Sequence, residues 1–571
     1  MVKNLNNTAE CFIYRGHSQP TTVAKFSPNG FWVASADVSG KIRVWSWDHP
    51  EHLTKLETLV FAGGVADLDW DNESKKIAVV GDGTGILVKC ITWDTGNNAG
   101  EMLGHNKRVL SVAYKPNRPF RIITASEDFK SLFYQGPPFK LDHSNSSHTN
   151  FVNCVRYAPN GSKAVSVGTD KKIQLYDGTT GEPTVDIVNA HDGGIYSVAF
   201  SPDSQHFLTA SADKTVKLWN AESLALEQTF TFSSDPQIGD AQVSVLWTAT
   251  HLVSVSLNGN INILDRNNPS TPRVINAHQV AITALHVDVA KKVAYTGSFD
   301  GVVISRNLAA PGEAVRVTGT DKRNIPGGAH GGKVVAIATH GDEILSVGWD
   351  DTLRSASAAT NAYGADTALT GQPSDLTQAS GTDLVLTVTN AEIALYRGLN
   401  KVSSLSVSYG PTCGALFGET ELAVGGGDNK THIYSIGAGF SLSETTTIPT
   451  RSAISSLAYS PVGDCLAIGD VGRQVEVYER GTWTPRIKDK WVFHTSKVTT
   501  LAWSPSGNVL ASGSLDENIF LWNNAKPNSK IQLAYAHMGG VTGLGWLSEE
   551  SLISSGNDHT LVTWKIPAEW A

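Results

Sequence analysis

The chain has 571 residues, which is too long for one ordinary hydrophobic core and indicates several domains or an array of repeats. Its 53 glycines and 15 tryptophans, with only 17% charged residues, favour short strands joined by tight turns over long helices. The net charge of -9, without any long run of Lys or Arg, argues against nucleic acid and anionic membranes as partners.

The cysteines and the amino-terminal residues indicate a reducing compartment. The five cysteines are odd in number, widely scattered and free of any CxxC pair, which argues against a disulfide framework and a zinc site. The first residues, MVKNLNNTAECFIYRGH, lack the apolar run of a signal peptide, and no stretch approaches the roughly 20 apolar residues that span a bilayer. We therefore expect a cytoplasmic protein.

A histidine, most often preceded by Gly or Ala, recurs along the chain. His105, His148 and His191 stand 43 residues apart, and longer steps elsewhere fit two or four periods of similar length. Such a fixed period is the sign of a repeat architecture. We expect thirteen units, which begin near residues 17, 61, 105, 148, 191, 235, 278, 330, 371, 412, 453, 494 and 537.

The stretch Ala190–Asn220 predicts how each unit folds. Its apolar residues alternate over three short segments with turn residues between them, which is typical of strands, and a fourth strand fits before the next histidine. A unit of about 40–45 residues with four strands, a Gly-His start and a Trp-Asp-like end is typical of a WD-repeat blade. Because propellers close with 4–8 blades, thirteen units predict an all-β fold of two tandem WD-repeat β-propellers.

The longest step in the repeat predicts the domain boundary. His278 and His330 are 52 residues apart, and the turn-rich stretch TGTDKRNIPGGAH lies between them. We expect a first, seven-bladed propeller over residues 17–323 and a second, with six or seven blades, over residues 324–571. Residues 1–16 are expected to contribute to the second propeller.

A histidine, a serine and an aspartate within Ala190–Asn220 raise the question of a catalytic triad. A triad is needed once per site, whereas this constellation recurs with the repeat. It is found with the same spacing in two units, as His191, Asp213 and Trp219 and as His494, Asp516 and Trp522. We therefore interpret it as a structural tetrad.

The expected tetrad is a chain of hydrogen bonds within one blade. Asp213, in a tight turn, fixes His191; the imidazole meets the hydroxyl of Ser211 or Thr209, and that hydroxyl meets the indole of Trp219. Of the two, we assign Ser211 to the tetrad. Such a chain satisfies polar groups that are costly to bury alone.

Other motifs also have structural interpretations. The glycine-rich GGGDNK at residues 425–430 lacks the spacing of a phosphate-binding loop and predicts a hairpin. Asp142, His143 and His148 lie in a Ser/Asn-rich stretch that predicts a flexible loop rather than a metal site. The paired carboxylates that begin at Asp350 occupy the aspartate turn of the repeat. No catalytic, cofactor-binding or metal-binding residue is predicted, and no cofactor.

Several longer stretches resemble the actin-interacting protein one family of tandem WD-repeat proteins. They include GHNKRVLSVAYKPNRPFRIITASEDF from Gly104 and WVFHTSKVTTLAWSPSGNVLASGSLD from Trp491. GPPFK at residues 136–140 and LDRNNPS at residues 264–270 are not required by a propeller, so they make the resemblance specific. It extends from about Gly16 to the carboxyl terminus.

The resemblance implies a non-enzymatic protein of the actin cytoskeleton. Such a protein binds actin filaments and works with cofilin to disassemble them, including by capping filament ends, and we expect it to be a monomer. The family usually carries about one more blade before the first Gly-His, so we expect either a short or open second ring or a start at an internal methionine. The alternative function is a general WD-repeat scaffold or adaptor, such as a ubiquitin ligase substrate receptor, with a partner other than actin.

The resemblance also implies an actin and cofilin-binding surface on the first propeller, formed by Glu127, Phe139, Lys140 and Phe151. Phe139 follows two prolines, so we expect it in an exposed connector as a binding anchor. Leu141 stands where the family usually has an aromatic residue. Glu127 could equally occupy a blade turn, Lys140 could be an ordinary solvated lysine, and Phe151 could belong to the core.

Overall fold

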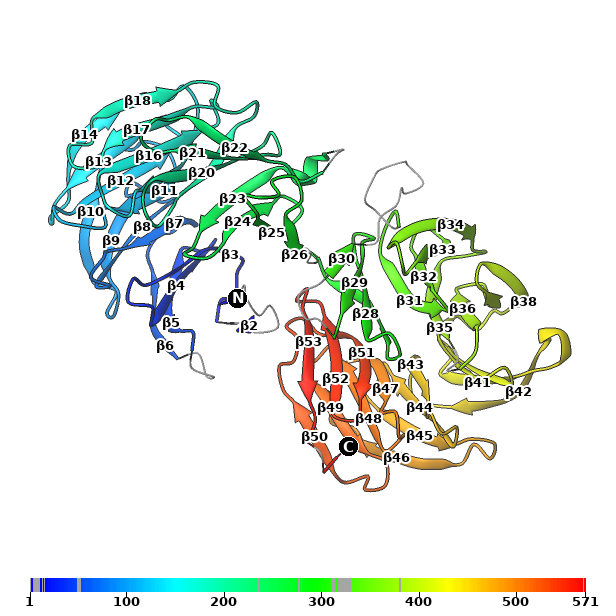
Figure 1. The fold of residues 1–571 in the computed structure, drawn as a ribbon. Helices are drawn as coiled ribbons and strands as arrows, with labels where there is room; N and C mark the ends of the chain where they lie inside the picture. Colours follow the sequence, from blue (N-terminus) through cyan, green and yellow to red (C-terminus); the bar gives the residue numbers. More distant parts are fainter. Residues whose placement is uncertain are drawn as a thin grey trace. The chain divides into compact units, whose positions relative to one another are not determined.

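The computed structural model describes residues 2–3, 11–12, 14, 16–48, 53–233, 236–275, 278, 280–309, 314–316, 330–378, 381–567 and 569–570. Within these residues the regular structure consists of strands and two short 3-10 helices, η1 (Ile238–Asp240) and η2 (Ala438–Phe440). The chain divides into two compact units, Met1–Ile275 and Asn276–Ala571 (Figure 1).

The first unit contains six four-stranded antiparallel sheets among its described residues, each built from strands that are consecutive in the chain. The strands are β3 (Thr21–Phe26), β4 (Trp32–Asp37), β5 (Lys41–Ser46), β6 (Thr54–Leu59), β7 (Val65–Trp70), β8 (Lys76–Gly81), β9 (Val88–Thr92), β10 (Asn98–Met102), β11 (Val109–Tyr114), β12 (Arg121–Ser126), β13 (Ser131–Gln135), β14 (Lys140–Asn145), β15 (Val152–Tyr157), β16 (Lys163–Gly168), β17 (Ile173–Asp177), β18 (Pro183–Ile187), β19 (Ile195–Phe200), β20 (His206–Ser211), β21 (Val216–Asn220), β22 (Leu226–Phe230), β23 (Gln242–Trp247), β24 (Leu252–Ser256), β25 (Ile261–Leu264) and β26 (Arg273–Ile275). The short strands β1 (Val2–Lys3) and β2 (Cys11–Phe12) pair with each other.

The second unit contains, in its described part, six four-stranded sheets and a final three-stranded sheet. Its strands are β27 (Ile282–Asp288), β28 (Val293–Ser298), β29 (Val303–Asn307), β30 (Ala314–Arg316), β31 (Val334–His340), β32 (Glu343–Gly348), β33 (Thr352–Ser357), β34 (Ala362–Ala368), β35 (Pro373–Gln378), β36 (Leu384–Thr389), β37 (Glu392–Arg397), β38 (Asn400–Ser406), β39 (Pro411–Phe417), β40 (Glu421–Gly426), β41 (Lys430–Ile436), β42 (Leu442–Pro449), β43 (Ile454–Tyr459), β44 (Cys465–Asp470), β45 (Val475–Glu479), β46 (Pro485–Trp491), β47 (Val498–Trp503), β48 (Val509–Ser514), β49 (Ile519–Asn523), β50 (Lys530–Leu533), β51 (Val541–Ser548), β52 (Ser551–Gly556) and β53 (Leu561–Lys565).

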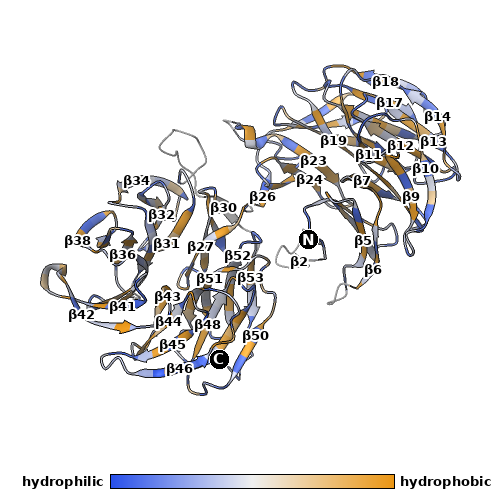
Figure 2. Ribbon diagram, turned by 180° about the vertical axis from the view of Figure 1, so that it is seen from behind, coloured by the Kyte–Doolittle hydropathy of each residue, from blue (hydrophilic) through white to orange (hydrophobic). Residues whose placement is uncertain are grey.

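The burial of successive strands explains how the sheets pack. The second strand of a sheet, such as β20, is buried over nearly its whole length, whereas the outermost strand, such as β18, is almost fully exposed. Figure 2 shows the same division, with apolar residues along the inner strands and hydrophilic residues frequent on outer strands such as β18 and β38. The core therefore lies between adjacent sheets, as in a propeller.

Neighbouring sheets pack through their first strands. In the first unit this packing runs from β3 through β7, β11, β15 and β19 to β23. In the second unit it runs from β27 to β51 and returns, because β51 also contacts β27. Seven sheets thus close a ring in the second unit. The predicted all-β propeller fold is confirmed, and each first strand begins within seven residues of a predicted unit start.

Hydroxyl groups link adjacent sheets around this ring. Thr412 Oγ1 donates a hydrogen bond to the carbonyl of Ile454, the first residue of the next inner strand, at 2.7 Å. Thr499 Oγ1 does the same to the carbonyl of Val541 at 2.6 Å. Because the inner strands of different sheets do not share a hydrogen-bonding ladder, these side chains satisfy backbone carbonyls that the sheets leave free.

The predicted distribution of blades is wrong. The sheet β27–β30 was expected in the first propeller, but it belongs to the second unit, because β27 packs against both β31 and β51. The first unit therefore holds six of the described sheets rather than seven. The predicted boundary itself, between residues 323 and 324, lies outside the described residues.

The expectation that residues 1–16 join the second propeller falls largely outside the described residues. The ring of Tyr14, which is described, stacks on Trp45 at 4.3 Å, and its hydroxyl is 2.8 Å from that of Thr54. Both partners belong to the first sheet of the first unit. At Tyr14 the chain is therefore part of the first unit.

Candidate functional site

The repeated His, Asp and Trp residues form the expected tetrads. In the fifth sheet, His191 Nδ1 is 2.8 Å from Asp213 Oδ2, and His191 Nε2 is 2.7 Å from Thr209 Oγ1. The indole of Trp219 donates to the same threonine hydroxyl at 2.9 Å. The chain of bonds connects the loop before the sheet, the turn after its second strand and its third strand.

The structure corrects the serine that was assigned to this tetrad. Ser211 is not the hydroxyl between imidazole and indole; Thr209 takes that place. Ser211 is the last residue of β20, next to the turn, and its hydroxyl accepts the backbone N–H of Asp213 at 3.1 Å. Because it lies one side-chain level beyond Thr209 on the strand, it caps the turn rather than reaching the ring.

The tetrad predicted from His494 has the same geometry. His494 contacts Asp516 at 2.9 Å and Ser512 at 2.8 Å, and the Trp522 indole donates to Ser512 at 2.8 Å. Burial raises the pKa of the Asp516 carboxyl, but hydrogen bonds from His494 and the Thr495 backbone outweigh burial and lower it to about 2. An ionised, fully hydrogen-bonded carboxylate in every such sheet suits a structural role.

Further units carry the same set with Trp or Tyr. They are centred on His17, His148, His330 and His537. The Ser/Asn-rich stretch is not the predicted loop, because residues 142–145 continue strand β14, and His148 bonds to Asp170 and Ser166. Within the described residues, no three His, Cys, Asp or Glu side chains are grouped to hold a metal ion.

Two of the residues expected to bind a partner lie at one end of the third and fourth sheets of the first unit. Glu127 occupies the turn between β12 and β13, and its N–H donates to the carbonyl of Arg108 at 3.1 Å. Phe151 precedes β15 and is 39% exposed, so it is not a core residue. Its ring lies 5.8 Å from that of Phe129, which is 36% exposed in the same turn as Glu127.

The other two residues are placed differently. Phe139 is not exposed; it is only 6% accessible and packs edge-on against Tyr114 at 5.8 Å. The turn after the two prolines brings its ring into the apolar cluster between the second and third sheets, so the expectation of an exposed anchor is wrong. Lys140 is exposed, but it begins β14 opposite Gln135, at the end of the sheet away from Glu127.

Phe129 is the surface residue that sequence reasoning missed. It follows Asp128 in a turn where its φ is 69°, and bulky residues rarely adopt this left-handed conformation. In several other units the residue after the aspartate is polar, for example Lys171, Lys214 and Glu517. An exposed aromatic where several other units have a polar residue was the available signal. The left-handed backbone itself is shared by Lys171, Lys214 and Glu517.

A cation completes this surface. Lys107 Nζ, from the loop before β11, lies 5.5 Å from the centre of the Phe129 ring. Lys107 is exposed, so the interaction leaves both groups accessible. We call the set Lys107, Glu127, Phe129 and Phe151 the aromatic surface. It presents two rings, one acid and one base, the mixture typical of protein-binding sites.

None of the helical segments in the described part of the chain is long and apolar enough to cross a membrane.

Comparison with known proteins gives both repeats and full-length relatives. The family model described as WD domain, G-beta repeat matches residues 9–46, 139–177, 183–220 and 488–523. The chain is 38% identical over 573 residues to the 66 kDa stress protein of Physarum polycephalum, and 37% identical over 571 residues to Actin-interacting protein 1 of Drosophila melanogaster. It is 36% identical over 577 residues to WD repeat-containing protein 1 of Xenopus tropicalis. Each alignment covers 99% of this chain, and 92–93% of the relative.

Proposed function

Because the chain belongs to the family of Actin-interacting protein 1, we propose that it binds actin filaments and promotes their disassembly together with cofilin. The observation that carries this proposal is identity to such relatives across 99% of the chain, which includes both units. The activity includes capping of filament ends and involves no catalysed reaction. The protein acts as a monomer in the cytoplasm, at the actin cytoskeleton.

The aromatic surface of the first unit is where we place contact with the filament. Exposed aromatic rings carry much of the energy of protein interfaces, and flanking charges set orientation and on-rate. Phe129 and Phe151 provide the rings and Lys107 and Glu127 the charges. Phe139 is too buried to take part, and Lys140 lies at the other end of its sheet.

Disassembly requires differential binding. A ligand shifts an equilibrium only if it prefers one of the states, so the protein must bind cofilin-altered filaments more tightly than bare ones. Two propeller units provide two surfaces, and a filament engaged by both gains avidity without strong binding at either. The rate of disassembly should therefore depend on cofilin occupancy.

Filament pelleting with and without cofilin tests this proposal. The wild-type chain should move actin to the supernatant only when cofilin is present. The variant Phe129→Ser/Phe151→Ser should need at least about tenfold more protein for the same effect, since loss of hot-spot rings costs 1.4 kcal/mol or more. Phe31→Ser is the matched control, because Phe31 is also exposed in the first unit but lies in the β3–β4 turn, at the opposite end of its sheet.

The outcomes separate the surface from the function. Full activity of the double variant would contradict the assignment of the aromatic surface as the filament contact, but it would not contradict the proposed actin function. Equal binding to bare and cofilin-decorated filaments would contradict the mechanism. A chain that neither pellets with filaments nor changes them would favour the scaffold alternative.

A further inference from the structure

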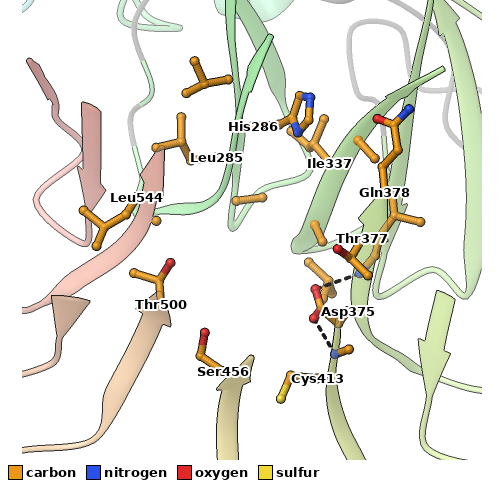
Figure 3. Close-up of a pocket in the computed structure, with 18 of the residues that line it drawn as sticks. Leu285, His286, Ile337, Asp375, Thr377, Gln378, Cys413, Ser456, Thr500 and Leu544 are labelled. Carbon is orange, nitrogen blue, oxygen red and sulfur yellow. Dashed lines mark hydrogen bonds between the residues drawn. The ribbon is translucent and has the colours of Figure 1, made fainter. Parts of the chain in front are cut away.

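The first strands of the seven sheets in the second unit surround a cavity of about 820 Å³, which we call the channel of the second unit. Figure 3 shows side chains from β27, β31, β35, β39, β43, β47 and β51 around it. Most of its lining is apolar or hydroxylated, for example Leu285, Ile337, Ser456 and Thr500. Asp375 brings a carboxylate into this lining.

The Asp375 carboxylate is held in place by backbone groups. Its Oδ1 accepts the N–H of Leu376 at 2.8 Å, and its Oδ2 accepts the N–H of Gly414, on the next inner strand, at 2.9 Å. No salt bridge joins it to a basic side chain in the described part of the chain. Burial accordingly raises its pKa to about 6.

The first unit contains the same carboxylate with its charge balanced. Asp67 of β7 accepts the N–H of Leu68 at 2.9 Å and that of Val112, on the next inner strand, at 3.2 Å. It also accepts a hydrogen bond from Arg156 Nη1 at 3.0 Å and lies 3.4 Å from Lys25 Nζ. Although burial raises the pKa of Asp67, the two cations outweigh burial and lower it to about 2.

The strand registers identify what replaces the two cations in the second unit. Asp67 and Asp375 both follow the bulge of their strands, opposite Val80 and Val388. On the preceding inner strand, Val23 is the residue that directly follows the bulge, and Lys25 lies two residues after it. In β31 the same position is occupied by Ala338, two residues after Ala336.

The second cation is replaced in the same way. Arg156 lies two residues after the bulge of the inner strand two sheets further on, and Ala458 takes that position in β43. Both cations are thus replaced by alanine, while the carboxylate and its two backbone donors remain. Ala338 lines the cavity, so the space that a long basic side chain would fill at this position is part of it.

We propose that the channel of the second unit binds an ammonium or guanidinium group from outside the chain, which pairs with Asp375 as Lys25 and Arg156 pair with Asp67. A buried carboxylate is costly unless it is paired, so an incoming cation regains what the chain itself supplies in the first unit. The hydroxyls of Ser456 and Thr500 lie in the same lining and are available as acceptors for its N–H groups. The cation is carried either by a small free amine or by a Lys or Arg side chain of a peptide.

Other titratable groups face the channel. Burial lowers the pKa of His286 to about 4, and burial raises the pKa of the Cys413 thiol to about 12, so neither changes charge between pH 5 and 7.5. Asp288 also lines the cavity and adds a second carboxylate to it.

Titration calorimetry on the full chain tests the proposal at pH 7.5. The probes are n-butylammonium, n-propylguanidinium and the peptide acetyl-Gly-Lys-Gly-amide. Asp375→Asn, which keeps the shape but removes the charge, should weaken binding at least tenfold, as should Ala338→Lys, which restores an internal cation. Asp342→Asn is the control, since this carboxylate is 91% exposed on the same unit. The wild-type protein at pH 5, where Asp375 is protonated, should bind at least fivefold more weakly.

Each outcome decides a part of the proposal. Binding of the free amines identifies a small-molecule site, and binding of the peptide alone identifies a side chain of another protein as the ligand. Absence of saturable binding by all three probes overturns the proposal. So does binding that is unchanged in both Asp375→Asn and Ala338→Lys.

Discussion

The ion pair between the inner strands of the first unit makes a specific prediction about Arg156→Ala. The substitution removes the closest cation of Asp67 and leaves the buried carboxylate with Lys25 at 3.4 Å and its hydrogen bonds to Ser111 and the backbone. Removing one partner of a buried pair is strongly destabilising because the other charge stays buried. The variant thus approaches the arrangement that Asp375 has in the second unit.

The magnitude follows from the pKa of Asp67. Its lowering from 3.8 to about 2 corresponds to about 2 kcal/mol of stabilisation at neutral pH. Complete loss of a buried partner costs about 3–5 kcal/mol in other proteins, but Lys25 remains, so we expect a loss of about 2–3 kcal/mol at pH 7. In the wild type the contribution is complete above pH 3.8 and disappears as the pH falls through about 2. In the variant the pKa of Asp67 rises, so the loss shrinks as the pH falls from 7 to 4.

Pulse-labelling hydrogen exchange along a urea series measures the two units separately in the full chain. Peptides from β11 and β15 report the first unit, and peptides from β47 report the second unit as an internal control. The double variant Asp67→Asn/Arg156→Ala should recover part of the loss, because no charge is then left unpaired. A loss below about 1 kcal/mol at pH 7, or a double variant less stable than Arg156→Ala, would refute the reasoning.

Three further predictions concern the tetrads and the channel of the second unit. Thr209→Val should cost the first unit about 2 kcal/mol in urea unfolding, because the histidine and the indole both lose their partner, whereas Ser211→Ala should cost under about 1 kcal/mol; equal losses would contradict the tetrad assignment. Asp516→Asn should destabilise the second unit by about 2 kcal/mol at pH 7 and hardly at pH 2, because the lowered pKa of Asp516 contributes above 3.8 and is lost as the pH falls through about 2; acid titration followed by tryptophan fluorescence checks this. Asp375→Asn should stabilise the second unit by up to about 3 kcal/mol at pH 7, because the raised pKa of Asp375 is a cost above pH 6 that vanishes below 3.8; thermal unfolding at pH 7 and pH 4 tests the sign.

The sequence predicted the sheets and tetrads well because both depend on local spacing. His191 and Asp213 are 22 residues apart within one repeat, and the sheet between them fixes their distance. The prediction of Ser211 instead of Thr209 was wrong because residues 209 and 211 are two apart and lie on the same face of β20. Only the position of the third strand decides between their hydroxyls. Spacing alone does not contain that information.

The distribution of blades and the burial of Phe139 depend on contacts between sheets. Strand β27 joins the second unit through β51, which follows it by more than 200 residues, and no local feature of the sequence marks that contact. Phe139 is buried in the apolar cluster between the second and third sheets, which includes Met102 of β10, although two preceding prolines indicated an exposed connector. In both cases the deciding partner lies outside the repeat unit that was being interpreted.

The inner strands of the two units extend this argument to function. Arg156 reaches Asp67 across 89 residues of chain, so a comparison of adjacent repeats does not reveal the pair. The fold needs a bulge and a backbone donor at these positions, which both units keep, but it does not require a particular side chain two residues beyond the bulge. That position is Lys25 or Arg156 in one unit and Ala338 or Ala458 in the other. A propeller can therefore hold its structure constant while the charge of its channel changes, and the residues free to change are those that a ligand would meet.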